Sequence, residues 1–207
     1  MIAKTLSACR VLPVITAKDV ESTVALSQAL SRGGMKAVEI TLRTPAALDS
    51  IREVAAQVPE MLVAAGTVTN PDELRRAVEA GASMVVSPGS TPRLLRAARE
   101  AGIDFVPGVT TASEVMRGLD EGYDCFKLFP AVAVGGLNLL NSLAGPFPDV
   151  KFCPTGGLNP ANFREFLARP NVVCCGGSWM VAADLVDNHR WDEIEVLARD
   201  AMASAPG

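Results

Sequence analysis

One lysine lies where a charged side chain is not expected. Lys127 sits in the middle of the apolar run Cys125-Phe-Lys-Leu-Phe-Pro130, whereas the other four lysines lie at or outside the ends of the predicted elements. Burial of an ammonium group without a partner is costly, so an interior position favours the neutral amine. A neutral lysine amine can attack a ketone and form a Schiff base. Lys127 is therefore a candidate nucleophile, with a purely structural buried ion pair as the alternative.

A carboxylate and a guanidinium share one face of a second apolar segment, Ala37-Val-Glu-Ile-Thr-Leu-Arg43. The period of two in a strand places Glu39, Thr41 and Arg43 on one face and the apolar residues on the other. A glutamate that points into the interior needs a partner, and Lys127 is the candidate. Glu39 could then serve as a general acid–base. Arg43 lies at the C-terminal end of the segment and has the fork geometry that binds a substrate carboxylate.

Two glycine pairs follow apolar segments in the last third of the chain. Cys153-Pro-Thr-Gly-Gly-Leu158 precedes a helix expected to begin at Pro160, and Cys174-Cys-Gly-Gly-Ser-Trp179 repeats the pattern. Phosphate groups bind to backbone N–H groups in such loops and to helix N-termini. The residues that would allow close approach of the backbone, or offer a hydroxyl, are Gly157, Gly176, Gly177 and Ser178.

The elements that must position these residues form a regular alternation. Eight short apolar segments, each after the first preceded by a stretch of helical period, predict strands at residues 11–16, 37–41, 62–68, 84–88, 105–109, 125–130, 151–155 and 172–176. Continuous apolar strands that alternate with helices favour a parallel sheet covered by helices. Eight units predict an α/β fold that closes as a (β/α)8 barrel, with one extra helix before residue 10. We expect a single domain over residues 1–207.

The boundaries of the predicted helices carry recognisable signals. Asn-Pro or Thr-Pro pairs start helices at residues 70–71, 91–92 and 159–160, and glycines at 33–34, 81, 102 and 122 end them. An open doubly wound sheet is the alternative, but no Gly-x-Gly-x-x-Gly motif follows the first strand. In a barrel, the site lies at the C-terminal strand ends, and phosphate binds after strands seven and eight. Thr67, Pro88 and Gly108 would add to that rim.

Composition excludes several classes of function. The net charge is −4 and the pI is about 5.1, so there is no basic surface for nucleic acid or an anionic membrane. No apolar run is long enough for a transmembrane helix and no signal-peptide pattern is present, so we expect a cytoplasmic protein. The single histidine, His189, cannot supply a zinc site of the usual kind. The five cysteines lack CxxC spacing and are expected as buried free thiols.

Several motifs together resemble the 2-keto-3-deoxy-6-phosphogluconate (KDPG) and 4-hydroxy-2-oxoglutarate (KHG) aldolase family. They run in the family's order over nearly the whole chain, which makes the resemblance specific. The matching stretches are Val38-Glu-Ile-Thr-Leu-Arg-Thr44, Ala65-Gly-Thr-Val68, Ser87-Pro-Gly89, Pro107-Gly108, Lys127-Leu-Phe-Pro-Ala131, Phe152-Cys-Pro-Thr-Gly-Gly157 and Gly176-Gly-Ser-Trp179.

The resemblance implies a role for each matched residue. Lys127 would be the Schiff-base lysine and Glu39 the general acid–base of a class I aldolase that cleaves KDPG to pyruvate and glyceraldehyde 3-phosphate, and also KHG. Arg43 and Thr67 would hold the pyruvate moiety. Thr155 would lie near the hydroxyls on the aldehyde side, and Gly157, Gly177 and Ser178 would bind the phosphate. Further substrate-binding candidates are Pro88, Phe129, Gly156 and Gly176. The family pattern further implies a compact homotrimer without cofactor or metal. Val132 stands where a glutamate is common, which affects the expected substrate preference.

Three other functions stay open at this point. The barrel could house an isomerase or epimerase in which Glu39 is the base and Lys127 an electrostatic group. It could be a non-catalytic protein that binds a sugar phosphate. It could also be an aldolase for 2-dehydro-3-deoxy-6-phosphogalactonate, because the sequence does not specify the configuration at C4 of the substrate. A Schiff base on Lys127 would distinguish an aldolase from the first two.

Overall fold

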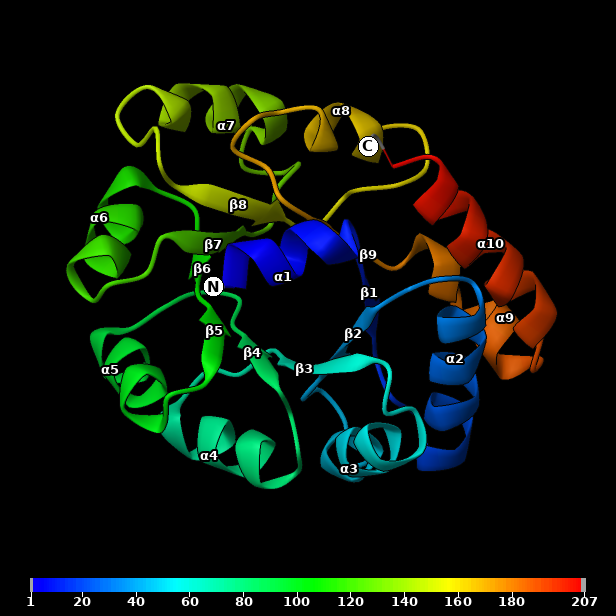
Figure 1. The fold of residues 1–207 in the computed structure, drawn as a ribbon. Helices are drawn as coiled ribbons and strands as arrows, with labels where there is room; N and C mark the ends of the chain where they lie inside the picture. Colours follow the sequence, from blue (N-terminus) through cyan, green and yellow to red (C-terminus); the bar gives the residue numbers. More distant parts are fainter. Residues whose placement is uncertain (1, 206–207) are drawn as a thin grey trace.

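A ring of parallel strands, surrounded by helices, makes up the computed structural model, which describes residues 2–205 (Figure 1). The strands are β1 (Val11–Ile15), β2 (Ala37–Thr41), β3 (Leu62–Gly66), β4 (Met84–Val86), β5 (Asp104–Val106), β6 (Gly108–Val109), β7 (Cys125–Leu128), β8 (Lys151–Pro154) and β9 (Cys175–Gly177). Their order is β5-β4-β3-β2-β1-β9 in one sheet and β6-β7-β8 in the other. A parallel bridge between Thr155 and Gly176 joins β8 to β9 and continues the ring.

Each predicted strand has a counterpart, but five of them end one or two residues earlier than predicted, and two differ more. The fifth is divided at Pro107 into β5 and β6, because proline has no N–H to donate to a ladder. The last begins at Cys175 rather than Val172, which makes only an isolated bridge to Phe152. The barrel fold predicted from the sequence is confirmed.

Most helices lie outside the ring in the connections between strands; the first helix precedes β1, and the last ones follow β9 (Figure 1). They are α1 (Ile2–Cys9), α2 (Val20–Arg32), α3 (Ala47–Gln57), α4 (Pro71–Glu79), α5 (Pro92–Ala101), α6 (Ala112–Asp120), α7 (Gly136–Ala144), α8 (Phe163–Leu167), the 3-10 turn η1 (Trp179–Val181), α9 (Ala183–Asp187) and α10 (Trp191–Ala203). The side chains of Asn70, Thr91 and Thr111 cap α4, α5 and α6, and Thr111 forms a capping box with Glu114.

The expected helix start at Asn159-Pro160 is wrong. The Asn159 carboxamide accepts the N–H of Ala161, and the Asn162 carboxamide accepts the N–H of Asn159, so these residues form a turn. The helix α8 starts only at Phe163. An Asn side chain that closes a local turn competes with a helix start of the same composition.

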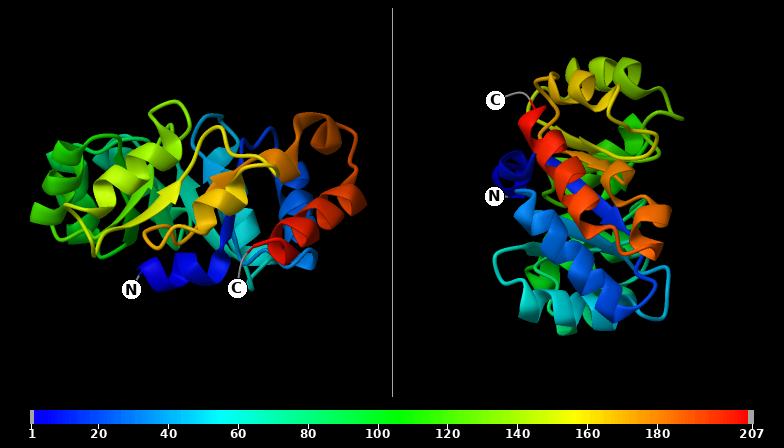
Figure 2. Two further views of the ribbon diagram at one scale, coloured as in Figure 1. Left: turned by 90° about the horizontal axis from the view of Figure 1, so that it is seen from above. Right: turned by 90° about the vertical axis from the view of Figure 1, so that its right-hand side faces the viewer.

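Side chains of alternate residues fill the interior of the barrel. Near the N-terminal ends of the strands, the interior holds an apolar layer that includes Leu12, Ala64, Met84, Val106, Cys125, Cys153 and Cys174. The helix α1 lies across this end of the barrel (Figure 2) and adds Leu6 and Cys9 to the same cluster. Val38 and Ile40 of β2 belong instead to the larger cluster between strands and helices. The predicted division of β2 into a polar inner and an apolar outer face is therefore confirmed.

All five cysteines are free and buried, as expected from the sequence. Burial raises the pKa of the Cys9 thiol to about 11, with the neighbouring Cys153 adding to the effect. Burial likewise raises the pKa of Cys125 and Cys175 far above the usual range for a thiol. The thiols therefore serve as small apolar groups that fill the barrel and the space around it.

Candidate active site

Lys127 and Glu39 meet inside the barrel. The Lys127 Nζ donates to both carboxylate oxygens of Glu39, at 2.9 Å to Oε1 and 3.2 Å to Oε2. Lys127 is 6% exposed and Glu39 1%, so the pair is almost fully withdrawn from solvent. Transfer of one proton along the shorter hydrogen bond converts the ion pair into a neutral amine and a carboxylic acid. The pair can thus supply both a nucleophile and a proton carrier.

The strands bring this pair together from opposite parts of the ring. Glu39 lies in β2, in register with Val14 of β1 and Ala64 of β3. Lys127 lies in β7, in register with Gly108 of β6 and Cys153 of β8. Both side chains point inward, above the apolar layer at the N-terminal end, and meet across the lumen.

Space for the Glu39 carboxylate depends on Gly66. A Cβ added at Gly66 would lie 2.3 Å from Glu39 Oε1 and 2.6 Å from its Cγ. Such distances are far below ordinary contact, so any larger residue here would displace the carboxylate. Gly66 ends β3 beside the catalytic pair, and sequence analysis gave it no role of its own.

Arg43 lies two residues beyond the end of β2 and is held by Thr67. The Arg43 Nε donates to Thr67 Oγ1 at 3.2 Å. Thr67 has a φ of 59°, a left-handed conformation that is rare for a β-branched residue. Strain of this kind persists where the surrounding structure requires it, often at functional sites. Here it coincides with the contact that orients an exposed guanidinium at the mouth of the barrel.

A cavity of about 150 Å³ opens beside Lys127 at the C-terminal ends of the strands. Predicted site residues make up most of its lining: Arg43, Lys127, Phe129, Thr155, Gly156, Gly157, Gly177 and Ser178. The Lys127 Nζ also lies 5.5 Å from the centroid of the Phe129 ring, within range of a cation–π contact. Val14 and Leu158 complete the lining, and sequence analysis did not name them.

Backbone donors are available at one side of this cavity. Gly156 and Gly157 have φ values of 100° and 82°, conformations that favour glycine. Within residues 2–205, the N–H groups of Gly156, Gly157 and Ser178 donate to no protein acceptor. Adjacent free N–H groups form an anion-binding concavity. Ser178, whose side chain carries a hydroxyl, also lines this cavity.

Thr155 has an unusual hydroxyl. Thr155 is 6% exposed, and its Oγ1 is buried without a hydrogen-bond partner among the described residues. A Cβ added at Gly176 would lie 2.2 Å from this oxygen, so the glycine makes room for the side chain. A buried hydroxyl without a hydrogen-bond partner is destabilising unless a bound ligand provides that partner.

Four predicted residues do not line this cavity: Glu39, Thr67, Pro88 and Gly176. Glu39 reaches it through the contact with Lys127. Pro88 follows β4, and its carbonyl packs against Gly108, where an added Cβ would lie 2.3 Å from the Pro88 carbonyl carbon. Gly176 lies in β9 beneath Thr155. Thr67 is likewise absent from the lining and reaches the site through Arg43. Gly176 and Thr67 therefore affect the cavity through Thr155 and Arg43, whereas Pro88 packs against Gly108.

Metal-binding clusters and membrane-spanning helices are both absent from residues 2–205. No group of three or more His, Cys, Asp or Glu side chains within residues 2–205 could hold a metal ion. No helix in that range is both long and apolar enough to cross a membrane. His189 is exposed after α9, with its ring edge-on to Trp191.

The sequence matches the family described as KDPG and KHG aldolase over residues 2–197. It is 49% identical to the 2-dehydro-3-deoxy-phosphogluconate aldolase of Pseudoalteromonas atlantica, over 95% of this chain and 92% of that protein. It is 50% identical to the KHG/KDPG aldolase of Escherichia coli K12, over 94% of this chain and 92% of that protein.

Comparison of structures gives the same relationship. The Legionella pneumophila KDPG aldolase, solved with pyruvate captured as a covalent carbinolamine, has a TM-score of 0.95 and 43% identity, covering 97% of this chain and 98% of its own. A buried lysine–glutamate pair at the C-terminal end of a barrel suits the same covalent chemistry. The chain therefore belongs to the KDPG and KHG aldolase family, as a class I aldolase and hence a carbon–carbon lyase.

Proposed function

We propose that this aldolase cleaves KDPG to pyruvate and glyceraldehyde 3-phosphate through a Schiff base on Lys127. The observation that carries the proposal is the buried contact between Lys127 Nζ and the Glu39 carboxylate, at 2.9 Å, beside a cavity with free backbone donors. The names and covalent pyruvate adduct of its relatives support the same reaction.

The reaction begins when the neutral amine of Lys127 attacks the C2 ketone and forms a carbinolamine. Glu39 donates a proton to the departing hydroxyl, and loss of water gives an iminium ion. The iminium then accepts the electron pair of the C3–C4 bond as Glu39 removes the proton of the C4 hydroxyl. The aldehyde leaves, and an enamine remains on Lys127. One carboxylate suffices because the proton transfers follow one another.

The second half of the reaction frees the enzyme. The enamine takes a proton at C3 from Glu39 and becomes the iminium of pyruvate. Water adds at C2, the bond between carbon and Nζ breaks, and pyruvate leaves. Arg43 binds the carboxylate of the keto acid throughout, because its guanidinium stands at the cavity and is oriented by Thr67.

The other end of the substrate meets the glycine-rich wall. The free N–H groups of Gly156, Gly157 and Ser178 bind the phosphate, and Thr155 Oγ1 gains a hydroxyl partner from the sugar chain. The Val132 side chain packs against Gly157, where an added Cβ would lie 2.7 Å from Val132 Cβ. Val132 therefore adds an apolar group to the phosphate side of the rim.

Borohydride reduction tests the covalent step. Incubation with pyruvate and borohydride is expected to inactivate the enzyme and to add the mass of the reduced adduct to the peptide that contains Lys127. Lys127→Arg keeps the charge but cannot form the Schiff base under these conditions, so it should be neither labelled nor active. Labelling of another lysine, or cleavage by Lys127→Arg, would contradict the assignment. An isomerase that uses Lys127 only as a charge predicts no labelling.

The preferred keto acid needs a separate comparison. We propose KDPG as the main substrate and KHG as a second one, in line with the names of the relatives. A KDPGal structure shows the same fold at a lower identity of 26% and a TM-score of 0.79. Rates of pyruvate release from KDPG, its C4 epimer and KHG would rank the three. Faster cleavage of the epimer would reverse the proposal.

We also propose that the enzyme assembles as a homotrimer in the cytoplasm. Met116 and Leu119 of α6 are 57% and 40% exposed and lie one helical turn apart, so α6 offers an apolar strip for a subunit contact. Five free thiols suit a reducing compartment. Light scattering on the purified protein measures the mass, and a monomer would contradict the assembly. Cell fractionation tests the location.

A further inference from the structure

The glycine-rich wall proposed to bind the phosphate, at Gly156, Gly157 and Ser178, contains no positively charged side chain. Of the residues that line the catalytic cavity, only Arg43 and Lys127 are positively charged. In the proposed reaction, Arg43 binds the carboxylate and Lys127 becomes the covalent link. A phosphate monoester carries about two negative charges at neutral pH, and backbone N–H groups bring only partial charges to it. The nearest source of a full positive charge must therefore lie outside this cavity.

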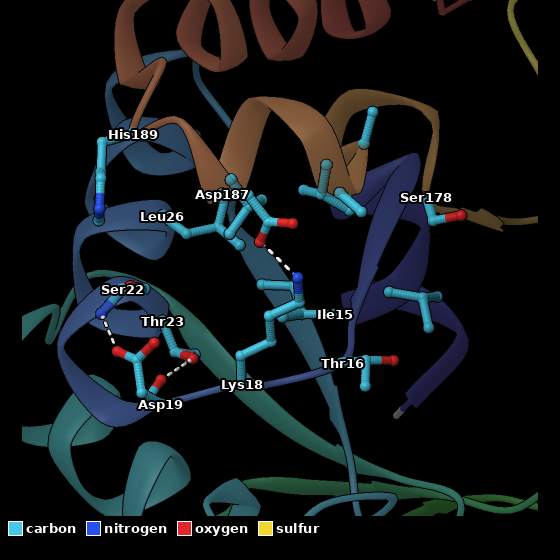
Figure 3. Close-up of a pocket in the computed structure, with 15 residues that line it drawn as sticks. Ile15, Thr16, Lys18, Asp19, Ser22, Thr23, Leu26, Ser178, Asp187 and His189 are labelled. Atoms are coloured by element: carbon cyan, nitrogen blue, oxygen red, sulfur yellow. Dashed lines mark hydrogen bonds and ion pairs between the residues drawn. The ribbon is translucent and has the colours of Figure 1, made fainter.

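A second and larger cavity adjoins the glycine-rich wall. It measures about 420 Å³ and shares Val14 and Ser178 with the catalytic cavity. Figure 3 shows Lys18 and Ser178 among its lining residues. Pro13 of β1 pairs with Gly177 of β9, so the segments that follow the two strands leave the barrel at the same end, and Lys18 and Ser178 both line this cavity.

Lys18 is held in this second cavity by an ion pair. Its Nζ donates to Asp187 at the end of α9, and the dashed line in Figure 3 marks the contact. Both side chains are about half exposed, at 54% and 48%. Exposed ion pairs contribute little to stability, so the flexible lysine can exchange one anion for another at small cost. Asp19 and His189 also line the cavity, but Asp19 is engaged as the N-cap of α2 through the Ser22 N–H.

We propose that Lys18 is a specificity-determining residue, which leaves Asp187 and provides the positive charge for the substrate phosphate at Ser178. This inference rests on the proposed function, since it assumes a phosphorylated keto acid in the catalytic cavity. Lys18 then selects phosphorylated over unphosphorylated substrates without taking part in bond cleavage. Asp187 sets the selectivity, because it competes with the phosphate for the same ammonium group.

The test compares KDPG with the same keto acid lacking its phosphate. Lys18→Gln is expected to raise KM for KDPG about fivefold, the size of an exposed charge pair, and to leave kcat and the unphosphorylated substrate unchanged. Asp187→Asn should lower KM for KDPG, because the lysine is no longer shared. Lys36→Gln is the matched control: Lys36 is exposed just before β2, at the other end of the barrel, and its loss changes the net charge equally.

Salt provides a further readout, since screening weakens exposed charge interactions. KM for KDPG should rise with ionic strength in the wild type and rise less in Lys18→Gln. Equal changes of KM for both substrates in Lys18→Gln, or the same change in Lys36→Gln, would overturn the role of Lys18. A wild-type enzyme without preference for the phosphorylated compound would instead contradict the proposed function.

Discussion

Replacement of Gly66 by alanine tests how closely the catalytic carboxylate is positioned. The new Cβ would lie 2.3 Å from Glu39 Oε1, 2.6 Å from Cγ and 2.8 Å from Cδ. Ordinary contact requires more than 3 Å, so the carboxylate must move by about 1 Å, and a displacement of that size costs on the order of 100-fold in rate. Gly66 does not have a positive φ, so the backbone itself accepts alanine.

The assay separates the two halves of the reaction. We propose that Glu39 carries the protons and that Lys127 forms the covalent bond. Gly66→Ala should therefore lower kcat about 100-fold while pyruvate and borohydride still label Lys127 to completion, more slowly. KM should change little, since Arg43 and the glycine wall are untouched. Overpacking should also lower the free energy of unfolding by about 1–3 kcal/mol.

Gly145 offers a matched control position for Gly66→Ala. Gly145, the C-cap of α7, has a φ of −65° and open space around it, so Gly145→Ala makes the same chemical change far from the pair. It should keep the wild-type rate. If correctly folded Gly66→Ala retains kcat within about twofold of the wild type, the Glu39 carboxylate can move without loss of activity, and the prediction is wrong.

Three further changes have distinct expected outcomes. Thr155→Val removes a buried hydroxyl that lacks a partner, so the free energy of unfolding in urea should rise by about 1 kcal/mol while kcat/KM falls roughly tenfold. Thr111→Ala deletes the cap of α6 and should cost about 1 kcal/mol in the same titration without changing kcat. The Cys9 pKa, raised by burial to about 11 from 9.0, means that the native state keeps its proton more firmly than the unfolded chain. The contribution of Cys9 to the free energy of unfolding is therefore fully present below pH 9 and is lost as the pH rises towards 11. Cys9→Ala should lessen this decline when unfolding is measured across that pH range. A less stable Thr155→Val would contradict the first prediction, and an inactive Thr111→Ala the second. The third is wrong if Cys9→Ala loses stability between pH 9 and 11 as steeply as the wild type.

Much of the fold and the central pair followed from simple patterns in the sequence. Eight apolar segments separated by helical periods predict the barrel, and the period of two in β2 predicts that Glu39 points inward. A lysine between Phe126 and Leu128 has few stable positions other than opposite that carboxylate. The same period of two in β1 could have identified Val14, two residues beyond the inward Leu12.

Other features depend on tertiary structure that no local pattern reports. Thr67 adopts a left-handed conformation that its side chain disfavours, so only the fold reveals it. Lys18 and Asp187 are 169 residues apart, and their contact depends on how α9 follows β9. The start of α8 does not follow from the sequence, because Asn159 can cap a helix or close a turn, and the neighbouring residues determine which of the two forms.

The filled lower half of the barrel has a consequence for the order of events. Side chains and α1 close the lumen at the N-terminal end, so reactants, products and water use the mouth at the opposite end. In the proposed reaction, pyruvate is bound covalently at Lys127, and the aldehyde lies between it and this mouth. The aldehyde must therefore depart before water can release pyruvate. In the synthetic direction, pyruvate must enter first, which makes this an ordered reaction imposed by the shape of the barrel.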